Sequence, residues 1–265
     1  MPVPFAMADG AEFNSFGFLT GLLAFCLANS AIYAINDVID RERDANHPRN
    51  RLRPVASGKI KSIHACVFAF GLIISAMLMT VLWATHDALL ILSAYVLLNL
   101  FYSLKAKHVP LLDVFILSSG YVLRVLLGCA LLGVTASNWL LLISSSLALF
   151  LAMGKRFADI QSGSGNEYRP SLRGYSLRYL EQALSITAAI TLIAYALYCR
   201  EAAVLIAGRE FYSLPFVVYG MLEYLRICNL EEKGDSPVEL LLTSPAILIC
   251  GIGWLIASLW SLGIL

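Results

Sequence analysis

Charge is scarce in this sequence of 265 residues, in which 14% of the residues are charged and 59% are hydrophobic. Soluble domains carry about 25% charged residues, so the composition excludes an ordinary soluble protein. The net charge of +1 gives no indication of a nucleic-acid partner. Apolar runs of about 20 residues recur without any alternating strand pattern, which predicts an all-α integral membrane protein in a lipid bilayer.

Paired cysteines and a signal peptide are also missing. The six cysteines form no C-x-x-C pair, and most lie inside or at the edges of apolar runs. We interpret them as small buried hydrophobes, which argues against a zinc site or a disulfide framework. Residues 1–12 lack a basic region and carry Asp9 and Glu12, so the first apolar run is expected to act as the insertion signal.

Apolar segments that are candidates for membrane spans number eight, several of them marginal in length. They fall at about 14–35, 62–83, 87–104, 111–133, 138–154, 181–199, 211–229 and 240–262. All Lys and Arg residues except Arg124, Arg200 and Arg209 lie on the side of the acidic loop that follows the first span. The positive-inside rule therefore predicts a multi-pass protein of the inner (cytoplasmic) membrane, with that loop facing the cytoplasm and both termini outside.

The most informative segment is this acidic loop, where Asn36, Asp37, Asp40 and Asp44 end the first apolar run. On a helix, the three Asp share one face. Carboxylates near a helix C-terminus oppose the macrodipole and repel one another, and a bound divalent cation would compensate both effects. Mg²⁺ commonly uses one or two carboxylates together with substrate phosphates, so we predict catalytic metal ligands in all three Asp. The alternative is a solvated, acidic helix end.

A basic run follows the acids, and the prolines Pro48 and Pro54 predict an ordered turn in it. His47, Arg51 and Arg53 lie in this run, close to the acids in sequence. Guanidinium groups bind phosphate oxygens in a forked geometry, so we predict that these residues contact a phosphorylated ligand. Topology alone also explains basic residues on a cytoplasmic face, although it does not explain the acids.

A second charged centre has the opposite bias. Lys155, Arg156 and Asp159 stand at the end of the fifth apolar segment, and Arg173 and Tyr175 follow after a polar loop. We predict that this cationic centre binds a second anion directly, without metal. Topology is again the alternative explanation for the basic residues.

Two further cations need an account. Lys105 ends the third apolar segment, where it could reach a phosphate or anchor the helix at the membrane surface. Arg124 lies about three turns inside the fourth segment, a depth at which a charge normally faces a polar cavity. We expect it to contact an anion or to pair with Asp113, with snorkelling to the surface as the alternative.

Taken together, these motifs resemble the UbiA superfamily of intramembrane prenyltransferases. The pattern N-D-x-x-D-x-x-x-D at 36–44 and the run H-P-x-x-R-x-R-P-x-A-S-G at 47–58 carry the resemblance. Tyr102 and Ser103 with Lys105, and the segment 120–124, strengthen it and add Tyr121 to the expected substrate contacts. The resemblance implies a helical bundle and a Mg²⁺-dependent reaction of a diphosphate.

Within this superfamily, the second centre is similar to the branch that transfers phosphoribosyl groups. Residues 154–159 resemble that branch's G-K-R-x-x-E, with Asp in place of Glu, and the segments 173–176 and 236–241 also match it. The resemblance implies transfer of 5-phosphoribose from phosphoribosyl diphosphate to a polyprenyl phosphate of the decaprenyl type, with release of diphosphate. It also implies a role in cell wall biosynthesis.

The sequence departs from the family pattern in its number of spans. Members usually have nine, so we expect a single UbiA-type domain over 1–265 that lacks the family's first helix. Two other functions stay open. One is an aromatic prenyltransferase that uses a polyprenyl diphosphate donor with an acceptor such as 4-hydroxybenzoate, and the other is an inactive membrane scaffold or a transporter. The sequence does not specify the lipid chain length. It also does not specify the oligomeric state, and it is compatible with a homo-oligomer.

Overall fold

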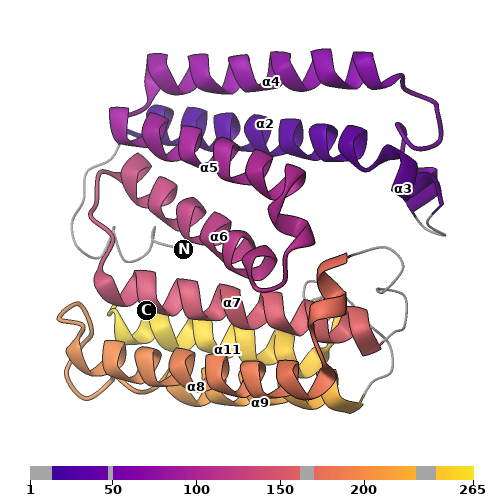
Figure 1. Cartoon of the computed structure of the whole chain (residues 1–265). Coiled ribbons are helices and arrows are strands. Elements are labelled where there is room, and N and C mark those ends of the chain that lie inside the picture. Colours follow the sequence, from indigo (N-terminus) through magenta and orange to yellow (C-terminus); the bar gives the residue numbers. More distant parts are fainter. Residues whose placement is uncertain (1–13, 47–49, 162–169, 231–242) are drawn as a thin grey trace.

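A computed structural model describes residues 14–46, 50–161, 170–230 and 243–265, and the described chain is helical with no strand. Eight of its helices are long, and all run roughly along one direction (Figure 1). Their bounds are α2 (Ser15–Ile39), α4 (Ser62–Trp83), α5 (His86–Leu104), α6 (Leu112–Leu132), α7 (Asn138–Gln161), α8 (Leu177–Glu201), α9 (Leu214–Leu230) and α11 (Pro245–Ser261). The shorter elements are α3 (Arg41–Ala45), η1 (Asn50–Leu52), η2 (Ala106–His108) and η3 (Pro170–Gly174).

These long helices confirm the eight predicted apolar segments as helices. Within the described residues, six of them, α2 and α4 to α8, are long and apolar enough to cross a membrane, while α11 is apolar but shorter. The main difference in bounds is at α7, which continues to Gln161, seven residues past the expected end at 154. The added residues carry the second charged centre, so this centre lies on a helix that projects beyond the apolar layer.

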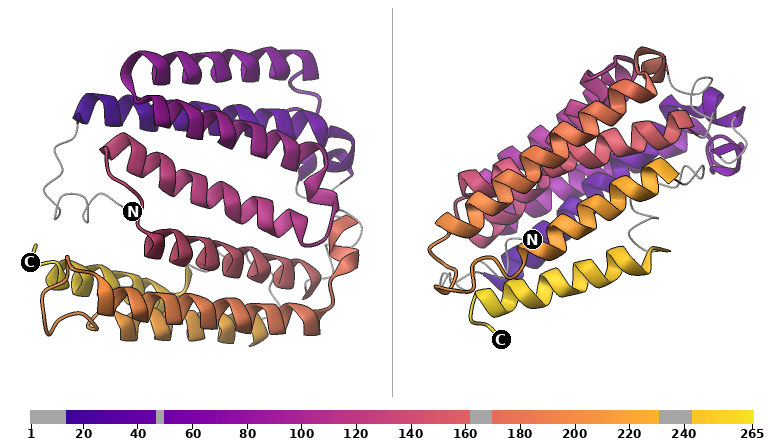
Figure 2. Two further views of the ribbon diagram at one scale, coloured as in Figure 1. Left: turned by 60° about the vertical axis from the view of Figure 1, so that its left-hand side comes forward. Right: turned by 90° about the horizontal axis from the view of Figure 1, so that it is seen from below.

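The helices form two groups with separate apolar cores. One core joins α2, α4, α5 and α6, and the other joins α7, α8, α9 and α11 with the start of α6 (Figure 2). Fully buried alanines on α2 and α4, such as Ala28 and Ala76, let these two helices approach closely, as small residues do in membrane proteins. Many large apolar side chains on the outer faces are exposed, which suits contact with lipid.

The polar connections gather at one end of the bundle. The elements α3, η1, η2 and η3 lie at this end, whereas the connections α4–α5, α6–α7 and α8–α9 lie at the opposite end (Figure 1). The turn between α5 and α6 has an unusual backbone, because Leu111 has a φ of 65°. A positive φ is costly for a residue with a branched side chain, so contacts from elsewhere must hold this turn in place.

Candidate active site at the polar end of the bundle

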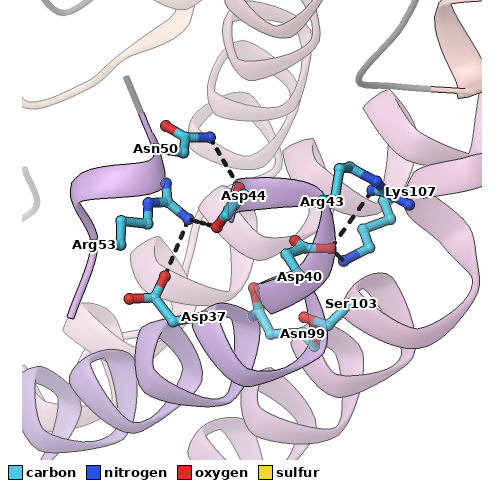
Figure 3. Close-up of polar contacts among 9 residues, drawn as sticks. All are labelled: Asp37, Asp40, Arg43, Asp44, Asn50, Arg53, Asn99, Ser103 and Lys107. Carbon is cyan, nitrogen blue, oxygen red and sulfur yellow. Dashed lines mark hydrogen bonds and ion pairs between the residues drawn. The ribbon is translucent and has the colours of Figure 1, made fainter. Parts of the chain in front are cut away.

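The acidic segment folds as two helices that meet at Asp40. The backbone of Asp40 leaves the helical region, with φ −91° and ψ 6°, so α2 ends before it and α3 begins after it. The prediction that the three Asp share one helical face is therefore wrong for Asp40, whereas Asp37 and Asp44 face the same partner, Arg53. Asp37 lies on α2 and Asp44 on α3, while Asp40 at the junction points to a different set of partners (Figure 3).

Arg53 joins Asp37 and Asp44. One of its guanidinium nitrogens, Nη1, lies 3.0 Å from Oδ1 of Asp37 and 2.9 Å from Oδ2 of Asp44 (Figure 3). Asp44 is almost fully buried and also accepts a hydrogen bond of 3.0 Å from the side-chain amide of Asn50. The basic run thus folds back onto the acids, which agrees with the predicted position of Arg53, while Arg51 in the same turn is exposed.

Lys107 is the partner of Asp40, and the sequence analysis did not identify it. Its ammonium nitrogen Nζ lies 2.7 Å from Oδ1 of Asp40, and the side chain is buried. Arg43 approaches the same oxygen at 3.5 Å (Figure 3). Lys105, which was predicted to contact substrate, is exposed, whereas the turn η2 places Lys107 on the inner side. Two lysines follow the end of α5, and the sequence pattern alone does not distinguish which of them faces the acids.

The oxygen atoms of Asp37 and its neighbours are of the kind that bind a hard divalent cation. Asn36 precedes Asp37 on α2, and its Oδ1 is buried and finds no hydrogen-bond donor among the described residues. The same residues do not bring any three His, Cys, Asp or Glu side chains together as a metal cluster. Since Mg²⁺ often takes only one or two carboxylates and completes its shell with substrate phosphates, Asp37, Asp44 and Asn36 fit this ion.

The second charged centre is built around Asp113, which is fully buried at the start of α6. Its Oδ2 accepts hydrogen bonds from Nε of Arg156 at 2.7 Å and from the hydroxyl of Ser171 at 3.1 Å. Its Oδ1 accepts a hydrogen bond of 2.7 Å from the hydroxyl of Tyr175. Arg156 also pairs with Asp159, at 3.2 Å. The predicted substrate contacts Arg156 and Tyr175 are therefore engaged with Asp113, which was one of the two partners expected for Arg124.

Tyr175 connects this centre to the strained turn. Its hydroxyl oxygen accepts a hydrogen bond of 2.6 Å from the backbone N–H of Leu111, the residue with positive φ. Burial, and then the hydrogen bond that it donates to Asp113, raise the pKa of Tyr175. Next to it, Gly174 packs against Pro110 so closely that an added Cβ would overlap the proline ring. The loop before α8 is thus fastened to the turn that carries Lys107.

Arg124 does not pair with Asp113, so the second of its two expected partners is excluded, while its contact with an anionic ligand stays a prediction. One of its nitrogens, Nη2, donates a hydrogen bond of 2.9 Å to the hydroxyl of Tyr95, which in turn donates to the side-chain oxygen of Asn29. The guanidinium carbon lies 4.8 Å from the ring centre of Tyr121 and 5.6 Å from that of Phe25. Aromatic faces stabilise a cation by about 1 kcal/mol each, so this environment accommodates the charge without a carboxylate.

The remaining predicted contacts lie at the surface of the polar end. Lys155 and Arg173 are exposed, and Asp159 is partly exposed beside Arg156. His47 and the segment 236–241 fall outside the described residues. The structure therefore brings Asp37, Asp44 and Arg53 together, with Asp40 and Lys107 beside them, but it does not bring the second group into the same cluster (Figure 3).

Comparison of the sequence with known protein families identifies the family of this chain. Residues 1–234 match the UbiA prenyltransferase family. The chain belongs to this family. This membership makes it a membrane transferase and confirms the predicted resemblance and helical fold.

Two relatives of this UbiA member are decaprenyl-phosphate phosphoribosyltransferases. The protein of Mycolicibacterium smegmatis is 35% identical over 178 residues, which cover 66% of this chain and 56% of that protein. The protein of Corynebacterium glutamicum is 30% identical over 266 residues, which cover 96% of this chain and 79% of that protein. A UbiA homologue of Archaeoglobus fulgidus, solved with DMAPP and Mg²⁺, has a TM-score of 0.75 at 19% identity and covers 100% of this chain and 94% of its own.

Proposed function

We propose that the protein transfers 5-phosphoribose from phosphoribosyl diphosphate to a polyprenyl monophosphate, with release of diphosphate. The observation that carries this proposal is the difference between the two centres. The first centre gathers three carboxylates, and Asp37 and its partner Arg53 are partly exposed. In the second centre, Asp113 and its partner Arg156 are both buried. One metal-chelated diphosphate and one directly bound phosphate match this pair of sites. The names of the two phosphoribosyltransferase relatives support the same reading.

Each residue of the first centre has a role in this reaction. Asp37 and Asp44, supported by Asn36, would hold Mg²⁺, which when bound neutralises the diphosphate as the bond to the sugar breaks. Arg53 would then exchange its carboxylate partners for phosphate oxygens, and Lys107 would keep Asp40 fixed at the edge of the site. The attacking lipid phosphate is already an anion, so no general base is required and positioning provides the main contribution.

The proposed location is the cytoplasmic side of the inner membrane. Basic residues gather in the connections at the polar end of the bundle, and such an excess is typical of cytoplasmic loops. Phosphoribosyl diphosphate is a soluble molecule and would reach the first centre from this side. The lipid acceptor would reach it from the bilayer.

The test is transfer of label from radiolabelled phosphoribosyl diphosphate to added polyprenyl phosphate, with Mg²⁺, by membranes that contain the protein. Labelled lipid is expected from the unchanged protein and from Asp87→Asn, a control acid on α5 at the opposite end. Asp37→Ala should give none. Labelling that persists in Asp37→Ala would exclude the assigned site.

An aromatic prenyltransferase is the main competing function. The same membranes are therefore given labelled polyprenyl diphosphate with 4-hydroxybenzoate. A prenylated aromatic product, without labelled lipid in the first assay, would replace the proposed reaction. Absence of both products in a well-expressed protein would favour a scaffold or a transporter.

A further inference from the structure

An apolar cavity lies in the second group of helices, away from the acidic centre. Its volume is about 380 Å³, and its walls come from α7, α8, α9 and α11. The few polar atoms in the walls are engaged within the protein. The Thr191 hydroxyl donates to the backbone oxygen of Thr187, and Trp254 Nε1 donates to Tyr195, whose hydroxyl also contacts Ser213. The cavity therefore offers a ligand only apolar surface.

The wall contributed by α7 leads directly to the second charged centre. Ile143, Leu147 and Leu151 line the cavity at intervals of four residues, and Lys155 is the next residue in this series. Residues four apart are neighbours along a helix surface, so the exposed Lys155 stands one turn beyond the apolar wall. From Ile143 to Lys155 this stripe is about 18 Å long.

The cavity opens between α7 and α11. Leu147 on α7 and Gly251 on α11 both line it, and both are exposed. At Gly251 an added Cβ would meet no atom within 4 Å, which confirms open space at this edge. Both residues lie within apolar helices, so the opening faces the region that lipid chains occupy.

We propose that this cavity holds the part of the isoprenoid chain nearest the phosphate of the lipid acceptor, with that phosphate in contact with Lys155. The inference rests on the proposed function and assigns the lipid to the second centre, so that the phosphosugar occupies the first. An apolar cavity with a cation at one end complements a single chain that carries one anionic head. A membrane phospholipid has two chains, and the volume is at the small end for ligand pockets.

The first experiment measures binding without any need for turnover. The purified full-length protein in detergent is irradiated with a polyprenyl monophosphate that carries a photoreactive group in its chain. We expect labelled peptides from α7 and α11, and competition by unlabelled polyprenyl phosphate but not by phosphatidylglycerol. Equal competition by phosphatidylglycerol, or labelling restricted to α2, α4 and α5, would overturn the inference.

The second experiment fills the cavity and compares two equivalent glycines. Gly251→Phe places a ring at the opening, while Gly71→Phe on α4 is the matched control, because Gly71 is also exposed, helical and without an atom within 4 Å of an added Cβ. We expect Gly251→Phe to abolish the photolabel and to raise the KM for polyprenyl phosphate about tenfold, with the KM for phosphoribosyl diphosphate unchanged. Gly71→Phe should behave as the unchanged protein, and equal effects of both variants would contradict the inference.

Lys155 provides the test of the phosphate end. Lys155→Met should raise the KM for the lipid about tenfold, and Lys155→Arg should restore it, since both cations bind phosphate. If the photolabel maps to the cavity but no phosphoribose is transferred, the proposed function fails and the lipid site remains. If phosphoribose is transferred but Gly251→Phe changes neither the label nor the KM for the lipid, the lipid site fails alone.

Discussion

The two charged centres lie at the same end of the bundle but differ in how their carboxylates are compensated. In the acidic centre, the side chains of Asp37 and Arg53 are 25% and 43% exposed, and Asn36 has a buried oxygen without a donor among the described residues. In the second centre, Asp113 and Arg156 are at most 1% exposed, and Asp113 accepts hydrogen bonds from three side chains. The pair of Asp37 and Arg53 can exchange partners with a ligand, whereas the pair of Asp113 and Arg156 cannot do so without a large cost.

This difference distinguishes ion pairs that a ligand can replace from ion pairs that stabilise the fold. Ion pairs near water are worth at most about 1 kcal/mol, so a ligand can replace them readily. A buried pair is different, because removal of one partner leaves an uncompensated charge. We therefore interpret Asp113, Arg156 and Tyr175 as the structural part of the second centre, which holds the loop before α8 against the turn that carries Lys107. The proposed contact with the lipid phosphate falls to Lys155, which is exposed.

The largest effect is expected from Asp113→Ala, which leaves Arg156 buried with only Asp159 as a partner. We expect a loss of about 3–5 kcal/mol in the free energy of unfolding, the usual cost of breaking a buried pair from one side. Thermal or denaturant unfolding in detergent measures it. The double variant Asp113→Leu with Arg156→Met removes both charges and should recover most of that loss. If Asp113→Ala unfolded like the unchanged protein, the two centres would not differ as described.

The acidic centre should respond in the opposite way. Asp37→Asn and Asp44→Asn keep the size of each side chain but remove a proposed metal ligand. Each should lower kcat by about a hundredfold, or roughly 2.7 kcal/mol in transition-state stabilisation. Stability should change little for Asp37→Asn, because that pair is partly exposed. Enzyme assays and unfolding curves on the same preparations test this separation. Equal losses of stability in Asp37→Asn and Asp113→Ala would contradict the assignment of a catalytic role to one centre and a structural role to the other.

The sequence specified the fold well and the acidic centre in part. Long apolar runs and the distribution of basic residues predicted eight helices with one polar end, because helix formation in a membrane depends mainly on local composition. The acids and Arg53 were also predicted. The break at Asp40 was not, since it depends on where η1 and Lys107 pack, and these contacts join residues 16 and 67 positions apart.

The second centre shows why charge patterns alone mislead. Arg156 and Tyr175 were predicted to bind an anion, and an anion is what they contact, but it is the protein's own Asp113. Asp113 follows the turn of Leu111, and nothing in the local sequence places that turn beside residues 171–175. The alternative pairing of Arg124 with Asp113 failed for the same reason, because aromatic rings from α2 and α5 lie against the guanidinium group instead.

Lys107 and Lys105 allow a sharper comparison within one turn. Lys107 is buried on Asp40, whereas Lys105 is exposed. Lys107→Met should lower kcat/KM about thirtyfold, or roughly 2 kcal/mol, because Asp40 then keeps only the weaker contact with Arg43. Lys105→Met, the matched control, should lower it less than threefold on the same scale. Steady-state kinetics with phosphoribosyl diphosphate distinguish them, and a larger effect at Lys105 would make that residue the phosphate contact.

The smallest expected effect concerns Tyr175 and appears as a dependence on pH. Tyr175→Phe removes the hydrogen bonds to Asp113 and Leu111 and should cost about 1.5 kcal/mol near neutral pH. Since burial raises the pKa of Tyr175, the folded protein keeps this proton at a pH where the unfolded chain, with a tyrosine pKa of about 10, has lost it. The stability contributed by the protonated hydroxyl is therefore complete below pH of about 10 and declines above it, because the unfolded state binds fewer protons. Unfolding measured from neutral to alkaline pH should show the gap between the unchanged protein and Tyr175→Phe narrowing in that range. A constant gap would mean that Tyr175 titrates normally and is not locked onto Asp113.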